Sequence, residues 1–341
     1  MVPTLGWSLW AAGFSAVQAS TPIAYGSFVK SATYSIANQL GYFTEEGLNV
    51  TYAQVPNSSF AYDGLLAGTY DILTGTIDNA VNLAFNSKAN LTGSDIVLAA
   101  TSTIETIHDL RGKLVMVDAA SSGYSFVLRR LLSFYGLQYG ADYSFQVVGG
   151  TPFRYQALLD GYLSNGSAVY ATVLTYPYTG FLEIRDDSTR RTSSGPHILA
   201  RVADFVAPFS SQTLTVRTST LTNTDTPAYH VTVAFVRAML RANRLLADPQ
   251  RRGQARDAIA AELGGIDEAT AARELAAATD AVTGETAQSE FQVSMTGLWN
   301  VIGIRDRFGG FAGAGDGFDF VEAVAGLVDY GVRDAARNGV V

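Results

Sequence analysis

The sequence contains no cysteine, and this absence excludes several kinds of site. Disulfides, iron–sulfur clusters, zinc–thiolate centres and thiol nucleophiles all need that residue. Without cross-links the fold must rely on its core, and 48% of the 341 residues are apolar. A chain of this length usually divides into more than one unit, so we expect two lobes.

Positive charge is also scarce. The chain has 23 Lys and Arg against 31 Asp and Glu, a formal charge of -8, and basic residues that are scattered along the sequence. This pattern excludes a nucleic-acid partner, because phosphate binding needs clustered Lys and Arg. The three histidines, His108, His197 and His230, are too far apart in the sequence to indicate a ligand pair, so we expect neither a metal nor a cofactor.

Apolar runs long enough to span a bilayer are missing as well. The run LGWSLWAAGFSAV covers residues 5–17 and is followed by small residues. It predicts a secretory signal over residues 1–19, and hence a secreted or periplasmic protein without direct membrane insertion after the signal is removed. The positively charged segment that usually precedes such a run is absent, so a buried N-terminal helix is the alternative.

Four Asn-x-Ser/Thr sequons occur, at Asn49, Asn57, Asn90 and Asn165. They predict N-glycosylation only if a eukaryotic cell makes the protein. Chance is the alternative explanation, since sequons arise readily in a chain rich in Ser, Thr and Asn.

Strand and helix patterns alternate along the first two thirds of the chain. A strand at 21–28, a helix at 31–43 and a strand at 48–55 begin the series, and a second unit of the same kind begins with the strand at 113–119. This order predicts α/β architecture with mostly parallel sheets. Helices dominate after about residue 220, where Thr226 with Pro227 and Asp248 with Pro249 each mark a helix start.

Several short segments, in their order, resemble a known family. They are QLGYFTEEGLNV, GLLAGTYDI, IHDLRGKLVMVD, a Ser/Gly helix start, LLSFYGL, ALLDG and PYTGF. Together they resemble the type II periplasmic substrate-binding proteins, and most of all the branch that serves sulfonates, taurine, nitrate and thiamine-pyrimidine precursors (the SsuA/THI5-like superfamily). The resemblance covers about residues 21–244.

The resemblance implies two α/β lobes, each a mostly parallel sheet flanked by helices, joined by two crossings with the ligand in the cleft between them. After the signal at 1–19, lobe one would combine residues 20–104 with 211–341, and lobe two would take residues 105–210. The crossings would then fall near residues 99–103 and 206–210.

Four strand-to-helix loops would face the cleft and supply the ligand contacts. Their candidate residues are Gly26, Ser27, Phe28 and Tyr34 in the first loop, Thr74 and Thr76 in the second, Ser121, Ser122, Gly123 and Tyr124 in the third, and Thr172, Thr175 and Tyr176 in the fourth. The third loop begins a helix, where Ser122 either contacts the ligand or only caps the helix. Asp78 is expected to be a helix cap.

The inferred pocket is neutral, and Arg154 and Lys30, the nearest basic residues, are expected to be solvated. The expected ligand is a small polar metabolite such as a pyrimidine or thiamine precursor, a sulfonate or a similar compound, and the aromatic content favours an uncharged or zwitterionic ring. No catalytic motif is complete: the S-x-x-K string at Ser27–Lys30 lacks its companion motifs.

We therefore expect a monomeric solute-binding protein, not an enzyme, that delivers its ligand to an ABC permease if the cell is bacterial. Two alternatives stay open. One is a cofactor-free lyase or hydrolase on the same fold, and the other is a eukaryotic secreted protein that uses the fold without a transporter.

Overall fold

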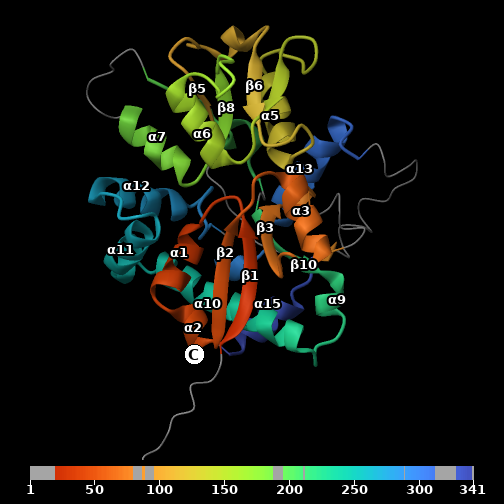
Figure 1. Cartoon of the computed structure of the whole chain (residues 1–341), viewed down its shortest axis with the longest axis vertical. Helices are drawn as coiled ribbons and strands as arrows, with labels where there is room; N and C mark the ends of the chain where they lie inside the picture. The colour runs from red at the N-terminus through yellow and green to blue at the C-terminus, as the bar shows by residue number, and fades with distance from the viewer. Residues whose placement is uncertain are drawn as a thin grey trace, which may run out of the picture.

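The computed structural model describes residues 20–79, 87–88, 96–186, 195–209, 212–287, 289–311 and 328–339. The predicted signal at 1–19 and the sequon at Asn90 lie outside these residues. Figure 1 shows two α/β units, one above the other.

Ten strands and the helices between them make up the described fold. The strands are β1 (Thr21–Ser27), β2 (Leu48–Gln54), β3 (Ile72–Thr76), β4 (Ser87–Lys88), β5 (Ile96–Ala100), β6 (Leu114–Val117), β7 (Ser144–Val147), β8 (Ala171–Thr175), β9 (His197–Arg201) and β10 (Gln212–Arg217). The α-helices are α1 (Ala32–Gln39), α2 (Tyr42–Glu45), α3 (Ser58–Ala67), α5 (Gly123–Ser133), α6 (Thr151–Asp160), α7 (Tyr178–Asp186), α8 (Ala203–Val206), α9 (Thr218–Leu221), α10 (Pro227–Ala247), α11 (Arg252–Glu262), α12 (Glu268–Ala278), α13 (Met295–Arg307) and α15 (Gly331–Arg337). Short 3-10 helices are η1 (Ile107–Leu110), η2 (Pro249–Arg251) and η3 (Ser289–Phe291).

Each unit is built on its own five-stranded sheet. The strand order is β2-β1-β3-β10-β4 in the first sheet and β7-β6-β8-β5-β9 in the second. In both sheets three neighbouring strands are parallel, and antiparallel strands complete the sheet: β10 beside β3, and β5 between β8 and β9. The predicted two-lobed α/β fold with mostly parallel sheets is confirmed.

The division between the lobes differs from the expectation. Residues up to 104 were expected in lobe one, but β5 pairs with β8 and β9 and so belongs to the second sheet. The chain therefore crosses into lobe two before residue 96. All five residues of β5 are buried, because it is an interior strand of its sheet. The strand is apolar throughout, a pattern that predicts a buried strand without saying which sheet it joins.

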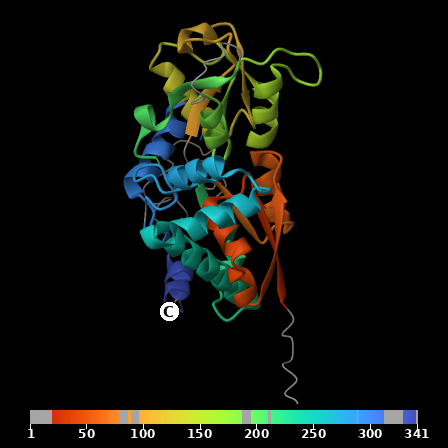
Figure 2. The ribbon, with the colours of Figure 1, turned by 90° about the vertical axis from the view of Figure 1, so that its left-hand side faces the viewer.

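The C-terminal third is not confined to lobe one either. Helix α13 packs against α5, and Ile304 of α13 belongs to the lobe-two core. Helix α12 contacts α7 of lobe two. Figure 2 shows the cyan and blue segments of this third packed on the lower lobe and reaching the upper one. This part of the chain therefore connects the lobes in addition to the strand crossings.

The core of lobe one forms between its sheet and the long helix α10. Thr226 accepts a hydrogen bond from the Tyr229 N–H, and Pro227 is the first helical residue, as the sequence predicts. The Tyr25 ring stacks on Tyr34 with centroids 5.2 Å apart and packs on Phe235 of α10 at 5.1 Å. Buried aromatic rings thus fix α1 and α10 to the same sheet.

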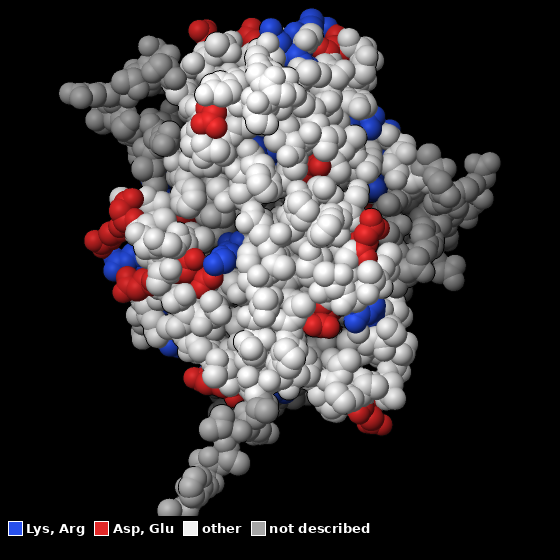
Figure 3. Space-filling model, viewed as in Figure 1, with Lys and Arg blue, Asp and Glu red and all other residues white. Residues whose placement is uncertain are grey.

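The face in Figure 3 agrees with the low count of basic residues. Lys and Arg side chains are scattered among acidic ones on the face in Figure 3. Within the described ranges, no helix is long and apolar enough to cross a bilayer.

Candidate ligand-binding site

The carboxyl ends of the parallel strands of both sheets meet at the junction of the lobes, and the chain makes direct contacts there. Ser58, at the start of α3 in lobe one, donates its hydroxyl to Asp118 Oδ2 at 2.6 Å. Asp118 follows β6 of lobe two. The Gly150 N–H of lobe two donates to the Pro56 carbonyl of lobe one at 2.7 Å. The lobes are therefore closed on each other in this structure.

The start of α5 faces lobe one at very short range. A Cβ placed on Gly123 would lie 2.7 Å from Thr76 Oγ1, and closer still to Asp78 Oδ1. Only glycine allows this approach, because real Cβ atoms essentially never come so near. Ser122 is the N-cap of α5 and accepts the Ser125 N–H. The backbone at the positive end of the helix dipole is thus placed directly against polar side chains of the other lobe.

Three oxygen atoms at this junction are buried without a hydrogen-bond partner among the described residues: Thr76 Oγ1, Asp78 Oδ1 and Asp118 Oδ1. Their residues are 3%, 0% and 2% exposed. Leaving such an atom unsatisfied costs about 1–3 kcal/mol, and more for a charged group. All three can accept hydrogen bonds, so N–H or O–H donors of a bound molecule would satisfy them.

Asp78 has a different role from the predicted one. It lies inside the helical turn 77–79 instead of preceding it, and it forms a buried ion pair with Arg305 at 2.8 Å. Arg305 also donates to Asn79 Oδ1 at 2.7 Å, and its guanidinium lies 4.7 Å from the centre of the Phe126 ring of lobe two. Sequence reasoning missed Arg305 because nothing local marks a residue on α13 as a partner of Asp78.

Arg154 is not solvated, contrary to the expectation. It is 2% exposed and donates to Thr172 Oγ1 and the Val173 carbonyl, both at 3.0 Å, as well as to Thr151 and Gly149. Its guanidinium therefore ties α6 to β8. Lys30 is partly buried and pairs with Glu262. Both side chains are thus paired within the protein, and neither supplies a free basic group to the junction.

The start of α1 forms a second polar region of the junction. Its first two N–H groups, of Ala32 and Thr33, donate to the Glu285 carboxylate at 2.7 and 2.8 Å. Nearby, Tyr25 Oη and Thr74 Oγ1 are 2.6 Å apart. Tyr176 of lobe two is buried in the same core cluster as Ala32, and Glu285 acts electrostatically on its hydroxyl, so this helix start lies on the side of lobe one that meets lobe two.

The predicted ligand residues divide into two groups. Those near the junction are Thr74, Thr76, Ser122, Gly123, Tyr124, Thr175 and Tyr176, whereas the others lie in loops or in the interior of one lobe. Gly26 packs against the Tyr70 ring, Tyr34 lies in the aromatic core and Thr172 holds Arg154. Ser27 Oγ bonds the Val29 carbonyl, Phe28 packs on a small lobe-one cluster, and Ser121 is exposed.

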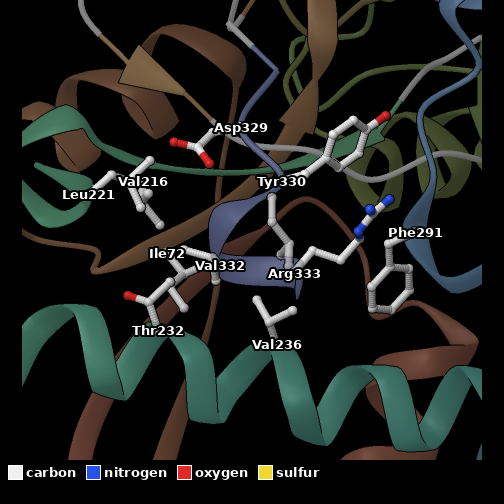
Figure 4. Close-up of a pocket in the computed structure, with 11 residues that line it drawn as sticks. Ile72, Val216, Leu221, Thr232, Val236, Phe291, Asp329, Tyr330, Val332 and Arg333 are labelled. Atoms are coloured by element: carbon white, nitrogen blue, oxygen red, sulfur yellow. The ribbon is translucent and has the colours of Figure 1, made fainter. Parts of the chain in front are cut away.

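A small cavity lies away from the junction, between the first sheet and helices α10 and α15. Its volume is about 40 Å³, and it is lined mostly by apolar side chains of β3, β10, α10 and α15, among them Ile72, Val236 and Val332 (Figure 4). It has room for a few water molecules but not for a metabolite. The strand ends that meet at the junction do not line it.

The fold and this junction define a two-lobed binding-protein architecture of the type II periplasmic kind. Residues 29–272, more than half of the chain, match the family described as NMT1/THI5 like. The chain belongs to that family, which confirms the resemblance seen in the sequence.

Solved structures share the fold at low sequence identity. The ligand-binding component of an ABC-type import system from Staphylococcus aureus, with zinc bound, is 13% identical with a TM-score of 0.67, covering 93% of this chain and 99% of that one. The nitrate-binding protein NrtA from Synechocystis PCC 6803 is 12% identical with a TM-score of 0.67, covering 94% and 89%. The aliphatic sulphonate-binding protein SsuA from Escherichia coli is 17% identical with a TM-score of 0.55, covering 85% and 86%. No curated protein matches the sequence.

Proposed function

We propose that the protein is a solute-binding protein that closes its two lobes on a small polar metabolite. The observation that carries the proposal is the convergence of buried, unsatisfied oxygens from both lobes, Thr76 and Asp78 from lobe one and Asp118 from lobe two, at the start of α5. A ligand that donates to these oxygens would have to displace the backbone of Gly123, which lies against two of them. By bridging the lobes it would favour their closed state, since a ligand shifts an equilibrium toward the state it binds better.

The same atoms favour a ligand that donates hydrogen bonds. Two of the three are carboxylate oxygens, which accept only, and the nearby cations are already paired. An amino-substituted ring, such as a pyrimidine or thiamine precursor, offers N–H donors and a flat apolar body that suits the buried tyrosines. A sulfonate offers acceptors only, so we rank it lower.

The structural neighbours support the cellular role in this proposal. Two are named as components of ABC-type systems, so we propose that the protein is a secreted or periplasmic monomer that presents its ligand to a permease if the cell is bacterial. Binding without turnover is part of the proposal. Conversion of a bound compound would instead assign a cofactor-free enzyme to the same fold.

A thermal-shift screen of residues 20–341 against aminopyrimidines, other heterocycles, amino acids, sulfonates and nitrate tests the proposal, because a ligand of the native state must raise the melting temperature. We expect a saturable rise with a donor-bearing heterocycle. Calorimetry on Asp118→Asn should show at least about tenfold weaker binding of that compound, a loss of about 1.4 kcal/mol. Asp160→Asn, in an exposed side-chain pair with Gln156 in the same lobe, is the control and should bind as the wild type does. A silent screen, or equal affinity of all three proteins, would contradict the proposed site.

A further inference from the structure

The first turn of α1 holds a carboxylate that comes from the chain itself. Ser31 caps the helix by accepting the Tyr34 N–H at 3.0 Å, and the preceding N–H groups of Ala32 and Thr33 go to Glu285 Oε1 and Oε2. A helix N-terminus binds an oxyanion in the same way: two adjacent N–H groups each donate to one of its oxygens. Here the anion is supplied by a residue 253 positions away from Ala32.

No basic side chain among the described residues pairs with Glu285. Its carboxylate is held by the backbone N–H groups of Ala32 and Thr33 and by the Thr33 hydroxyl. Burial raises the pKa of Glu285, although these three donors act in the opposite direction. The side chain of Asn243 donates to the Glu285 carbonyl at 3.2 Å and so helps to fix this segment of backbone. The carboxylate therefore occupies a position with two N–H donors for an anion, and no cation of the described residues pairs with it there.

Tyrosines of both lobes surround this position. Burial raises the pKa of Tyr25 to about 12, and the negative charge of Glu285 adds to that rise. The pKa of Tyr176 is raised by burial and by the charges of Glu274 and Glu285. Tyr176 is 6% exposed, and its hydroxyl has no hydrogen-bond partner within the described part of the chain. This buried hydroxyl of lobe two is therefore within electrostatic reach of Glu285 and has no partner of its own among the described residues.

We propose that Glu285 determines ligand specificity, by filling the anion position at the start of α1 and so excluding oxyanions from the interlobe site. The inference rests on the proposed function, because it assumes that the junction is where ligand binds. With the carboxylate in place, a sulfonate, nitrate or carboxylate ligand meets a negative charge and finds the two N–H groups occupied. Without it, those N–H groups and the Tyr176 hydroxyl become donors for an added anion.

The test removes the carboxylate and supplies anions from solution. Melting temperature and calorimetric affinity are measured for wild type and Glu285→Ala with methanesulfonate, nitrate and acetate. We expect no saturable response from wild type. The variant should melt lower on its own, and each anion should raise its melting temperature saturably, with affinity at least tenfold above that of wild type. Glu290→Ala is the matched control: Glu290 lies in the same C-terminal region, but its carboxylate pairs with Arg244 and Arg337.

A folded Glu285→Ala protein with no gain in anion affinity would overturn the inference, and so would tight binding of methanesulfonate by wild type. If Glu285→Ala folds only with anion present, that dependence supports it. If Glu285→Ala does not fold at all, Glu285→Gln is measured instead, because it keeps the size of the side chain and loses the charge. An unchanged ratio of anion affinity to heterocycle affinity in Glu285→Gln, compared with wild type, would then count against the inference. The proposed function fails separately, when wild type binds no metabolite of any class.

Discussion

Asp78 of lobe one lies against the backbone of Gly123, the first residue of α5 in lobe two, so closely that a Cβ at Gly123 would collide with the carboxylate. The carboxylate has little freedom to move, because its other oxygen is paired with the buried Arg305. The closed arrangement of the lobes therefore depends on a residue without a side chain at position 123.

Gly123→Ala should lower the free energy of unfolding by about 1–3 kcal/mol, the usual range for overpacking a well-packed interior. It should also weaken closure, which small-angle scattering would detect as a larger radius of gyration. Gly253→Ala is the control, since Gly253 lies in α11 and a Cβ placed there would meet nothing within 4 Å, and it should be neutral or stabilising by up to about 1 kcal/mol. Equal losses in the two variants would contradict this account.

Arg305→Met should destabilise the protein by about 3–5 kcal/mol, because it leaves the Asp78 carboxylate buried and unpaired. Chemical denaturation measures the loss. Adding Asp78→Asn to Arg305→Met removes the unpaired charge. The double variant should therefore lose less stability than the two single variants lose in sum. Arg256→Met breaks exposed pairs with Asp257 and Glu268 and should leave stability nearly unchanged. Strict additivity of the two changes at positions 78 and 305 would refute the coupling.

Ser122→Ala should reduce stability by about 1 kcal/mol, the usual effect of losing an N-cap. The Ser122 hydroxyl is engaged with the N–H and the hydroxyl of Ser125, while the backbone of Gly123 is unaffected by the substitution. We therefore expect ligand affinity within a few-fold of wild type, measured by calorimetry. Thr226→Ala removes the cap of α10, away from the junction, and should give a similar stability loss. A tenfold loss of affinity in Ser122→Ala alone would show that its hydroxyl binds the ligand.

The raised pKa of Glu285 predicts a pH dependence. Because burial raises the folded pKa of Glu285 above the ordinary value of 4.5, the fold favours its protonation more than the unfolded chain does. This contribution to stability is complete below 4.5 and is lost as the pH rises through the folded pKa, above which the carboxylate is charged. The stability of wild type relative to Glu285→Gln should therefore fall as the pH rises above 4.5. Thermal melts of both proteins measure it. Tyr25 and Tyr176 stay neutral because burial raises their pKa values further above 10. Glu274 is present in both proteins, so none of these groups accounts for a difference between them. A constant difference would contradict the prediction.

The sequence by itself determined the local structure and the class of fold. Alternating strand and helix patterns gave the parallel units, Thr226 with Pro227 marked the start of α10, and Ser122 marked the start of α5, because caps and periodicity depend on neighbours within a few residues. The segments that resemble the binding-protein family likewise kept their order along the chain.

Only the tertiary structure decided which charges are buried and what they meet. Arg305 lies 227 positions from Asp78, and Glu285 lies 253 positions from Ala32, so no local pattern could pair them. The same holds for Arg154, which looks like an ordinary helix residue in the sequence and is buried in the fold. Strand β5 joined the second sheet although its apolar sequence suits either one. In each case the outcome depends on desolvation and on contacts between distant segments, which exist only once the two lobes have packed together.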